Sequence, residues 1–242
     1  MTAFPHAEAG PGPAPPVPGA FRHAYSHLRL WGIAGVGLAL DLWSKDWAFS
    51  ELVPGASRPV VPGLIEFHLS LNPGALFGLG ANFAPLFVGA SVLALMFVLY
   101  LFLNSKSHHR ALHVGLALVL AGALGNLYDR VAEQAFVYHD PSTGYRHTGR
   151  LLKRDGLLVT VGDFQTGRNP QTYLVTSDVF AEHRPVVRDF IKIQARVLGL
   201  EVWPWVFNVA DALLVIGVAI LLLQFWFDHG DAPRPRESPS PP

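Results

Sequence analysis

The stretch Val206-Phe207-Asn208-Val209-Ala210-Asp211 opens an apolar run that continues to Phe227, and Asp211 is the only ionisable residue in that run. The run has the length of about 20 residues that crosses the hydrocarbon core of a bilayer. A charge at that depth costs at least about 2.5–3.5 kcal/mol, so such residues usually face a polar cavity at a functional site. Asn208 precedes Asp211 by three positions, which places both side chains on one helical face. A carboxylate that merely reaches water near a helix end is the simpler alternative.

The composition favours a membrane protein, because 50% of the residues are hydrophobic and only 15% are charged. We therefore expect an all-α membrane protein with four transmembrane helices, a small β-rich element outside the membrane and a short interfacial helix. The predicted membrane helices are Leu30–Phe49, Phe83–Leu103, Ala111–Tyr128 and Val206–Phe227. The first of them contains charged residues, and a cleaved signal peptide is the alternative there.

Lysine and arginine residues in the short loops predict the orientation. Arg22, Arg29, Lys106 and Arg110 lie on one side of the predicted helices, whereas Arg58 is the only such residue between positions 51 and 82. Basic loops stay in the cytoplasm, so we expect both termini there and a multi-pass membrane protein. The absence of cysteine excludes disulfides, a thiolate nucleophile and cysteine metal sites.

Changes in composition along the chain predict its domain organisation. Turn signals and short apolar runs predict strands at residues 64–69, 157–161 and 172–176, and residues 192–200 are expected to form the interfacial helix. We expect disordered cytoplasmic tails at 1–29 and 228–242. Three membrane helices should lie within 30–132, with an outer loop at 50–82, and an extracytoplasmic insertion should follow at 133–185. The segment 186–227 should contain the second catalytic motif, the interfacial helix and the last membrane helix.

Polar residues recur at the ends of the predicted helices. Asp41 and Lys45 have the spacing of an ion pair on one helical face, and we expect a structural role for them rather than a catalytic one. The segment Asn72–Gly78 combines an amide with glycines, which suits either close approach to a ligand or a plain turn. Asn126, Asp129 and Arg130 end the third helix, where an arginine that reaches water beside its local partner is the simpler alternative.

Four motifs together resemble lipoprotein signal peptidase (signal peptidase II), a family of bacterial membrane aspartyl peptidases. They are Asp41-x-x-x-Lys45, Asn72-x-Gly74-Ala75-x-Phe77-Gly78, Gly125-Asn126-Leu127-Tyr128-Asp129-Arg130 and Phe207-Asn208-x-Ala210-Asp211. The resemblance implies removal of signal peptides from lipid-modified prolipoproteins by cleavage before the diacylglyceryl-cysteine. It implies substrate-binding roles for Asn72, Gly74, Asn126, Arg130 and Asn208, and structural roles for Asp41, Lys45 and Asp129. Membrane lipids are implied partners, and no cofactor, metal or nucleic acid is expected.

The second catalytic aspartate of the family lies in a Val-x-Asp-Phe motif, which this chain contains twice, at Asp163 and at Asp189. The family places this motif shortly after the Asp-Arg pair, whereas roughly 50 extra residues intervene here. Asp189 precedes Asp211 by 22 positions, close to the separation typical of the family, and Asp163 precedes it by 48. We therefore expect Asp189 and Asp211 to form the catalytic pair.

Two neighbouring carboxyl groups can share one proton, so that one acts as an acid while the other deprotonates water. Motifs of other peptidase classes, such as His-Glu-x-x-His and Gly-x-Ser-x-Gly, do not occur in the sequence. A small transporter or proton-coupled channel is the alternative function, because polar residues inside a membrane also line ion paths.

Overall fold

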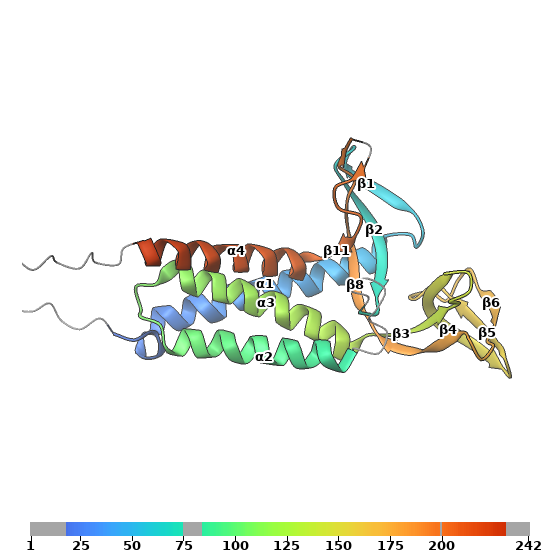
Figure 1. The fold of residues 1–242 in the computed structure, drawn as a ribbon, viewed down its shortest axis with the longest axis horizontal. Helices are drawn as coiled ribbons and strands as arrows, with labels where there is room; N and C mark the ends of the chain where they lie inside the picture. Colours follow the sequence, from blue (N-terminus) through green and yellow to red (C-terminus); the bar gives the residue numbers. More distant parts are fainter. Residues whose placement is uncertain (1–17, 75–83, 199, 231–242) are drawn as a thin grey trace, which may run out of the picture.

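The computed structural model describes residues 18–74, 84–198 and 200–230. In this part of the chain a bundle of helices occupies one end of the molecule, and β-sheets extend from the other end (Figure 1). The helices are η1 (Ala20–Arg22), α1 (Ala24–Glu51), α2 (Ala84–Leu103), α3 (Arg110–Ala132) and α4 (Val209–Gly230). Most of the two predicted tails, and residues 75–78 of the motif that begins at Asn72, lie outside the described residues.

The prediction of an all-α protein is wrong. The described residues also form a four-stranded sheet, a five-stranded sheet and a two-stranded hairpin, all of them antiparallel. Their strands are β1 (Ser57–Val61), β2 (Ile65–Asn72), β3 (Gln134–His139), β4 (Arg146–Asp155), β5 (Leu158–Gly162), β6 (Gln171–Leu174), β7 (Phe180–Pro185), β8 (Val187–Ile193), β9 (Arg196–Val197), β10 (Leu200–Glu201) and β11 (Val206–Phe207).

The prediction of four transmembrane helices is wrong as well. Among the described residues, two helices are long and apolar enough to cross a membrane, namely Arg110–Ala132 and Val209–Phe227. The apolar stretch described in α2, Gly89–Leu103, is shorter. Charged side chains interrupt α1 in its second half, and they lower its mean hydropathy. These residues include Asp41, Lys45 and Asp46.

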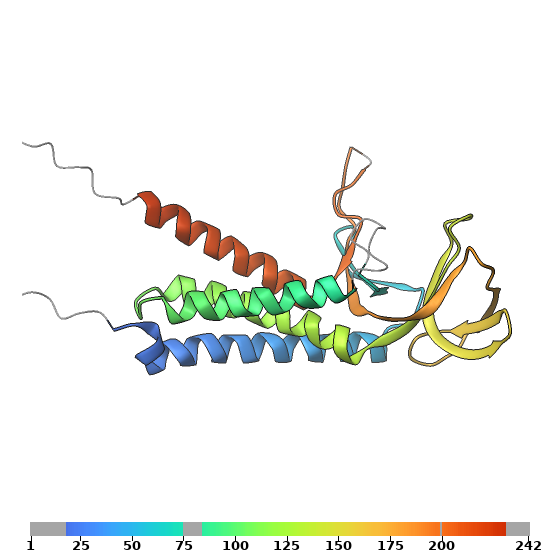
Figure 2. The ribbon, with the colours of Figure 1, turned by 60° about the horizontal axis from the view of Figure 1, so that its bottom comes forward.

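Small residues let α3 pack closely against its neighbours in the bundle. α3 contacts each of the other three α-helices, and Figure 2 shows α4 inclined to α1 and α2. A Cβ atom at Gly122 would lie 2.3 Å from the carbonyl oxygen of Ala210 in α4. A Cβ atom at Gly125 would lie 2.3 Å from Oδ2 of Asp41 in α1. The absence of side chains at these two positions therefore brings three helices together where α4 begins.

The four-stranded sheet has the order β1-β2-β8-β11 and lies at the end of the bundle where α4 begins (Figure 1). In β2 and β8, Ser70 is paired with Asp189 and Asn72 with Val187. β11 pairs with β8 and leads into α4 after Asn208. This connection fixes the first turn of α4 relative to β8, and β8 in turn pairs with β2 from a distant part of the sequence.

The predicted interfacial helix at residues 192–200 is wrong. β8 continues to Ile193, where it pairs with Ile65 of β2, and β9 and β10 then form a short hairpin. Leu198 between them has a φ of 53°, which suits a tight turn and not a helix. Pairing with β2, more than 120 positions earlier in the chain, overrides the local preference of this segment.

The insertion at residues 133–185 forms the five-stranded sheet, with the order β6-β5-β4-β3-β7. Its core contains the buried side chains Phe136, Tyr138, Val159 and Val161. The sheet lies beyond the end of the helical bundle, on the side of the four-stranded sheet (Figure 1). Phe164 connects the two parts, because it packs against a buried cluster that contains Phe49 of α1 and Phe190 of β8.

Candidate active site

Asn208 and Asp211 cap the start of α4. The Asp211 backbone N–H donates to Asn208 Oδ1 at 3.0 Å, and the Asn208 N–H donates to Asp211 Oδ2 at 3.1 Å. This reciprocal arrangement is a capping box, in which each side chain satisfies a backbone donor that the helix leaves unpaired. It holds the Asp211 carboxylate at the helix N-terminus, where the helix dipole favours negative charge.

Asp189 lies in β8 and is buried. Asn208 Nδ2 donates to Asp189 Oδ1 at 2.7 Å, so a single asparagine binds both Asp189 and Asp211. The side chain of Asn72 in β2 makes a second hydrogen bond to Asp189. Burial, and next the negative charge of Asp211, raise the pKa of Asp189 to about 8. Asp189 therefore carries a proton at neutral pH.

Asn126 of α3 joins Asp211 and Asn208 to Lys45. Its Nδ2 donates to Asp211 Oδ1 at 2.8 Å. Its Oδ1 accepts hydrogen bonds from Asn208 Nδ2 at 3.2 Å and from Lys45 Nζ at 3.3 Å. Since Lys45 can only donate and Asp211 Oδ1 accepts, these contacts fix which end of the Asn126 amide faces each partner.

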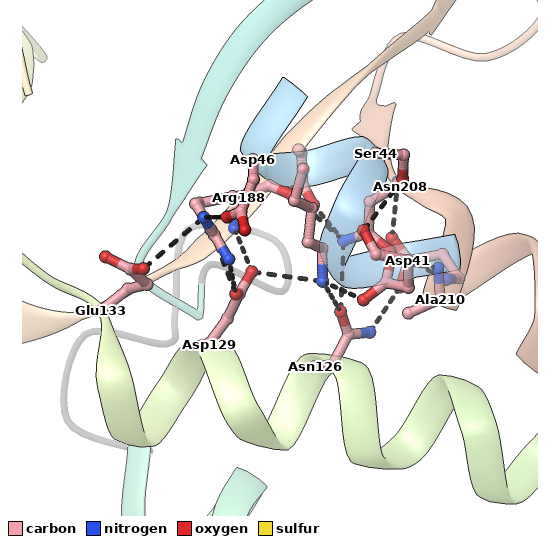
Figure 3. A network of polar contacts seen from close by, with 12 residues as sticks. Asp41, Ser44, Asp46, Asn126, Asp129, Glu133, Arg188, Asn208 and Ala210 are labelled. Carbon is pink, nitrogen blue, oxygen red and sulfur yellow. Dashed lines mark hydrogen bonds and ion pairs between the residues drawn. The ribbon is translucent and has the colours of Figure 1, made fainter. Parts of the chain in front are cut away.

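Asp41 and Asp129 belong to a buried network of charged side chains beside Asn126 (Figure 3). Lys45 of α1 lies 2.8 Å from Asp41 Oδ2 and 3.2 Å from Asp129 Oδ2, and none of these three side chains is exposed to solvent. Asp41 also accepts a hydrogen bond from the backbone N–H of Ala210 in α4 at 2.8 Å. The network therefore joins α1, α3 and α4 directly beneath the capping box.

Arg188 extends this network to β8. Its Nε and one terminal nitrogen donate to Asp129 Oδ1 at 3.1 and 2.8 Å, and its backbone N–H donates to Asp129 Oδ2 at 2.9 Å. The other terminal nitrogen lies 2.6 Å from Asp46 and 3.5 Å from Glu133. Arg188 is adjacent to Asp189 in sequence, so its contacts with Asp129 fix the position of Asp189 relative to α3.

A cleft of about 690 Å³ opens above Asp189 and Asp211. Ser70, Asn72 and Gly74 line it from β2 and the residues that follow, and Gly74 has a φ of 94°, which favours glycine. The remaining lining residues are Leu71, Pro73, Arg130, Arg146, Trp203, Trp205, Val206 and Phe207. The cleft combines two carboxyl groups, two guanidinium groups and an apolar wall, as expected for a site that binds an apolar peptide.

The structure brings together the residues that the sequence predicted for the site, and Asp163, the candidate that was not chosen, lies elsewhere. Asp163 lies in the turn after β5, where Asn169 Nδ2 donates to its carboxylate at 3.1 Å. It lines a separate cleft of about 270 Å³ between the insertion and β2. Among the described residues, no group of three or more histidine, aspartate or glutamate side chains is arranged to hold a metal ion.

Two site residues were not predicted from the sequence. Arg188 belongs to the same Val-x-Asp-Phe motif as Asp189. The charged residue directly before the predicted catalytic aspartate was the sequence signal that could have identified it. Arg146 comes from β4 of the insertion, and its sequence neighbourhood gives no sign that it reaches the cleft. Only the folded arrangement of the insertion beside β2 reveals its position.

Comparisons with known proteins agree on one family. The family model described as signal peptidase (SPase) II matches residues 33–227. A lipoprotein signal peptidase of Rhodopirellula baltica is 31% identical over 232 residues, which cover 92% of this chain and 84% of the relative. The lipoprotein signal peptidase of Moorella thermoacetica is 31% identical over 197 residues, which cover 81% of this chain and 92% of the relative.

A solved structure of a bacterial membrane enzyme resembles this fold, with a TM-score of 0.55 and 22% sequence identity. The matched region covers 90% of this chain and 96% of the solved one. At this identity the likeness concerns the fold alone.

Proposed function

The chain belongs to the signal peptidase II family, and we propose that Asp189 and Asp211 are the pair of carboxyl groups with which it cleaves peptide bonds. Membership makes the chain a peptidase that removes signal peptides from lipoprotein precursors, and the transporter alternative is not favoured. One observation supports an aspartic mechanism: Asp189 and Asp211 line one cleft and both bind Asn208.

The proposed reaction uses one proton shared by the pair. Asp189, whose raised pKa keeps it protonated at neutral pH, gives its proton to the scissile carbonyl oxygen. Asp211 takes a proton from the water molecule that attacks the carbonyl carbon. In the second step Asp211 gives that proton to the leaving nitrogen, while Asp189 recovers its proton from the hydroxyl group of the intermediate. The pair thus returns to its starting state after each cleavage.

We assign the other polar residues of the site by their contacts. Arg130 and Asn72 line the cleft and would bind carbonyl oxygens of the substrate, while Gly74 lets the peptide approach the backbone closely. Asn126 and Asn208 hold the two carboxyl groups in position. The buried charges have structural roles in this proposal, because they contact one another and the backbone beneath the cleft. They are Asp41, Lys45 and Asp129.

The membrane location and the lipid partner are also proposals. The apolar helices α3 and α4 suit the bacterial inner membrane, with the cleft near its outer face. Large apolar side chains are exposed along α2 and α4, as expected of helices that face lipid. They include Leu93, Met96, Phe97, Val215, Leu222, Leu223 and Trp226. Cleavage before a diacylglyceryl-cysteine would place the acyl chains on this surface, where each buried CH₂ contributes about 0.8 kcal/mol.

Cleavage of a purified diacylglyceryl-modified prolipoprotein tests the assignment of the pair. We expect Asp189→Asn and Asp211→Asn each to reduce turnover by several orders of magnitude, as the loss of one member of a catalytic unit does. Asp163→Asn is the matched control, because it makes the same chemical change in another cleft, and it should retain most activity. An inactive Asp163→Asn enzyme together with an active Asp189→Asn enzyme would show that the wrong aspartate has been assigned.

A further inference from the structure

We infer that Arg146, which the insertion contributes to the cleft, selects substrates that carry an acidic side chain just after the cleavage site. The inference rests on the proposed function, because it concerns the same cleft and the same reaction. It adds a specificity residue from a part of the chain that lies outside the four motifs shared with the family.

The position of Arg146 is the first observation. Arg146 begins β4 of the insertion, yet it lines the cleft that contains Asp189, Asp211 and Arg130. Its side chain is exposed, and among the described residues it makes no ion pair. Arg188, by contrast, is neutralised by carboxylates around it. Arg146 is therefore a cation at the cleft whose charge is available to a ligand.

The neighbours of Arg146 hold it toward the cleft. Tyr145 and His147 both bind the hydroxyl group of Tyr173, at 3.1 and 2.6 Å. Successive side chains of a strand point to opposite faces, so Arg146 points away from the face that carries this cluster. Arg146 is also paired with His139 of β3, which fixes its backbone within the sheet. The direction of its side chain thus follows from the sheet and not from a loose loop.

The insertion is itself docked against the wall of the cleft. Phe164 packs edge-to-face on Phe49 of α1, with 6.4 Å between the ring centroids. Ser70 and Leu71 of β2 line both the active-site cleft and the smaller cleft beneath the insertion. The same stretch of β2 therefore supports the insertion on one side and the catalytic cleft on the other, which places Arg146 at a set distance from the aspartates.

The side from which Arg146 enters indicates which part of the substrate it meets. The signal peptide is the apolar part of a prolipoprotein, and it matches the apolar outer surface of the helices. The five-stranded sheet lies beyond the helix ends, farther from the bundle than the four-stranded sheet (Figure 1), whose strands β2, β8 and β11 contribute to the cleft. The polypeptide that follows the cleavage site must leave the membrane in that direction. Arg146 therefore meets residues just after the cleaved bond, and a carboxylate is the side chain that a guanidinium binds best.

The test compares diacylglyceryl-modified prolipoproteins that carry Glu-Glu, Gln-Gln or Lys-Lys at the two positions after the cysteine. The measured quantity is the ratio of kcat/KM between substrates for the full-length enzyme. An exposed ion pair should give the wild type a preference of about two- to fivefold for Glu-Glu over Gln-Gln. Arg146→Gln should bring this ratio close to one, mainly through KM, and Arg146→Glu should favour the Lys-Lys substrate.

Arg150→Gln is the matched control, because Arg150 is an exposed arginine of the same strand that lines a different cleft. It should keep the wild-type preference. An unchanged ratio in Arg146→Gln, or an equal loss in Arg150→Gln, would overturn the inference while leaving the proposed function intact. Failure of the wild type to cleave any of the three substrates would instead contradict the proposed function.

Discussion

Replacing Asp129 with asparagine tests whether burial or distance sets the strength of the ion pairs beneath the site. Arg188 binds two carboxylates at similar distances, Asp46 at 2.6 Å and Asp129 at 2.8 Å. The Asp46 side chain is 71% exposed, whereas the Asp129 side chain is fully buried. Distance alone predicts that the loss of either carboxylate has the same effect. Burial predicts that Asp129 matters far more.

The contacts of Asp129 give the expected magnitude. Both Asp129 oxygens accept hydrogen bonds from Arg188, and one of them also lies next to Lys45. An asparagine at this position would therefore place its NH₂ group against the N–H donors of Arg188 or Lys45. Breaking a buried pair costs about 3–5 kcal/mol, while an exposed pair contributes about 0–1 kcal/mol. At about 2–4 °C per kcal/mol, Asp129→Asn should lower the unfolding temperature by about 6–20 °C. Asp46→Asn should lower it by no more than about 4 °C.

Thermal unfolding of the purified proteins in the same detergent measures this difference, and cleavage assays on the same samples report its effect on the site. Asp129→Asn should also reduce kcat/KM below the unfolding temperature, because Arg188 adjoins Asp189 and loses its main anchor. Asp46→Asn should remain close to the wild type in both measurements. Equal destabilisation by the two substitutions would refute the view that burial decides the strength of these pairs.

Two further predictions concern acid-base chemistry and packing. The raised pKa of Asp189 predicts that kcat/KM falls as pH rises through about 8, when the acid loses its proton, and that Asp163→Asn keeps this profile. Because the folded pKa lies above the ordinary value of 3.8, this group should also lower the free energy of unfolding as pH rises from about 4 to about 8, a dependence that Asp189→Asn removes. Gly125→Ala should destabilise the protein by about 1–3 kcal/mol in denaturant unfolding, because the added methyl group would displace Asp41. Gly35→Ala, where the added methyl group meets no neighbouring side chain or other helix within 4 Å, should be neutral or slightly stabilising.

Local sequence predicted the helical residues of the site better than it predicted the strands. The capping residues Asn208 and Asp211 and the ion pair of Asp41 with Lys45 depend on spacings of three or four positions, which a helix converts directly into contacts. The pairing of β2 with β8 joins residues more than 100 positions apart, and no local pattern reports such a partner. Residues 192–200 show this limit, because their composition suits an interfacial helix while their partners make them strands and turns.

The candidate site shows the same division. The motifs contain Asn72, Asn126 and Asn208, whose amides hydrogen-bond to Asp189 or Asp211, because the resemblance rests on those residues. The roles of Arg188 and Arg146 could be assigned only from the structure. Arg188 binds the buried Asp129, and Arg146 reaches the cleft because the whole five-stranded sheet packs beside it. Asp163 has the same sequence motif as Asp189, so only the chain separation from Asp211 distinguished them before the structure placed them in different clefts.

The ends of the insertion explain how a whole sheet can lie between two parts of the site without separating them. β3 leaves α3 and β7 returns beside it, with Gln134 paired with Pro185. The Val186 N–H then donates to the carbonyl oxygen of Glu133 at 3.1 Å, which closes the neck of the insertion. Directly below this neck, Arg188 binds Asp129 of α3. Because the two ends of the insertion meet at this closed neck, α3 and β8 lie next to each other as they would if a short loop joined them. The sheet can therefore contribute the Arg146 side chain to the cleft without separating the two parts of the site.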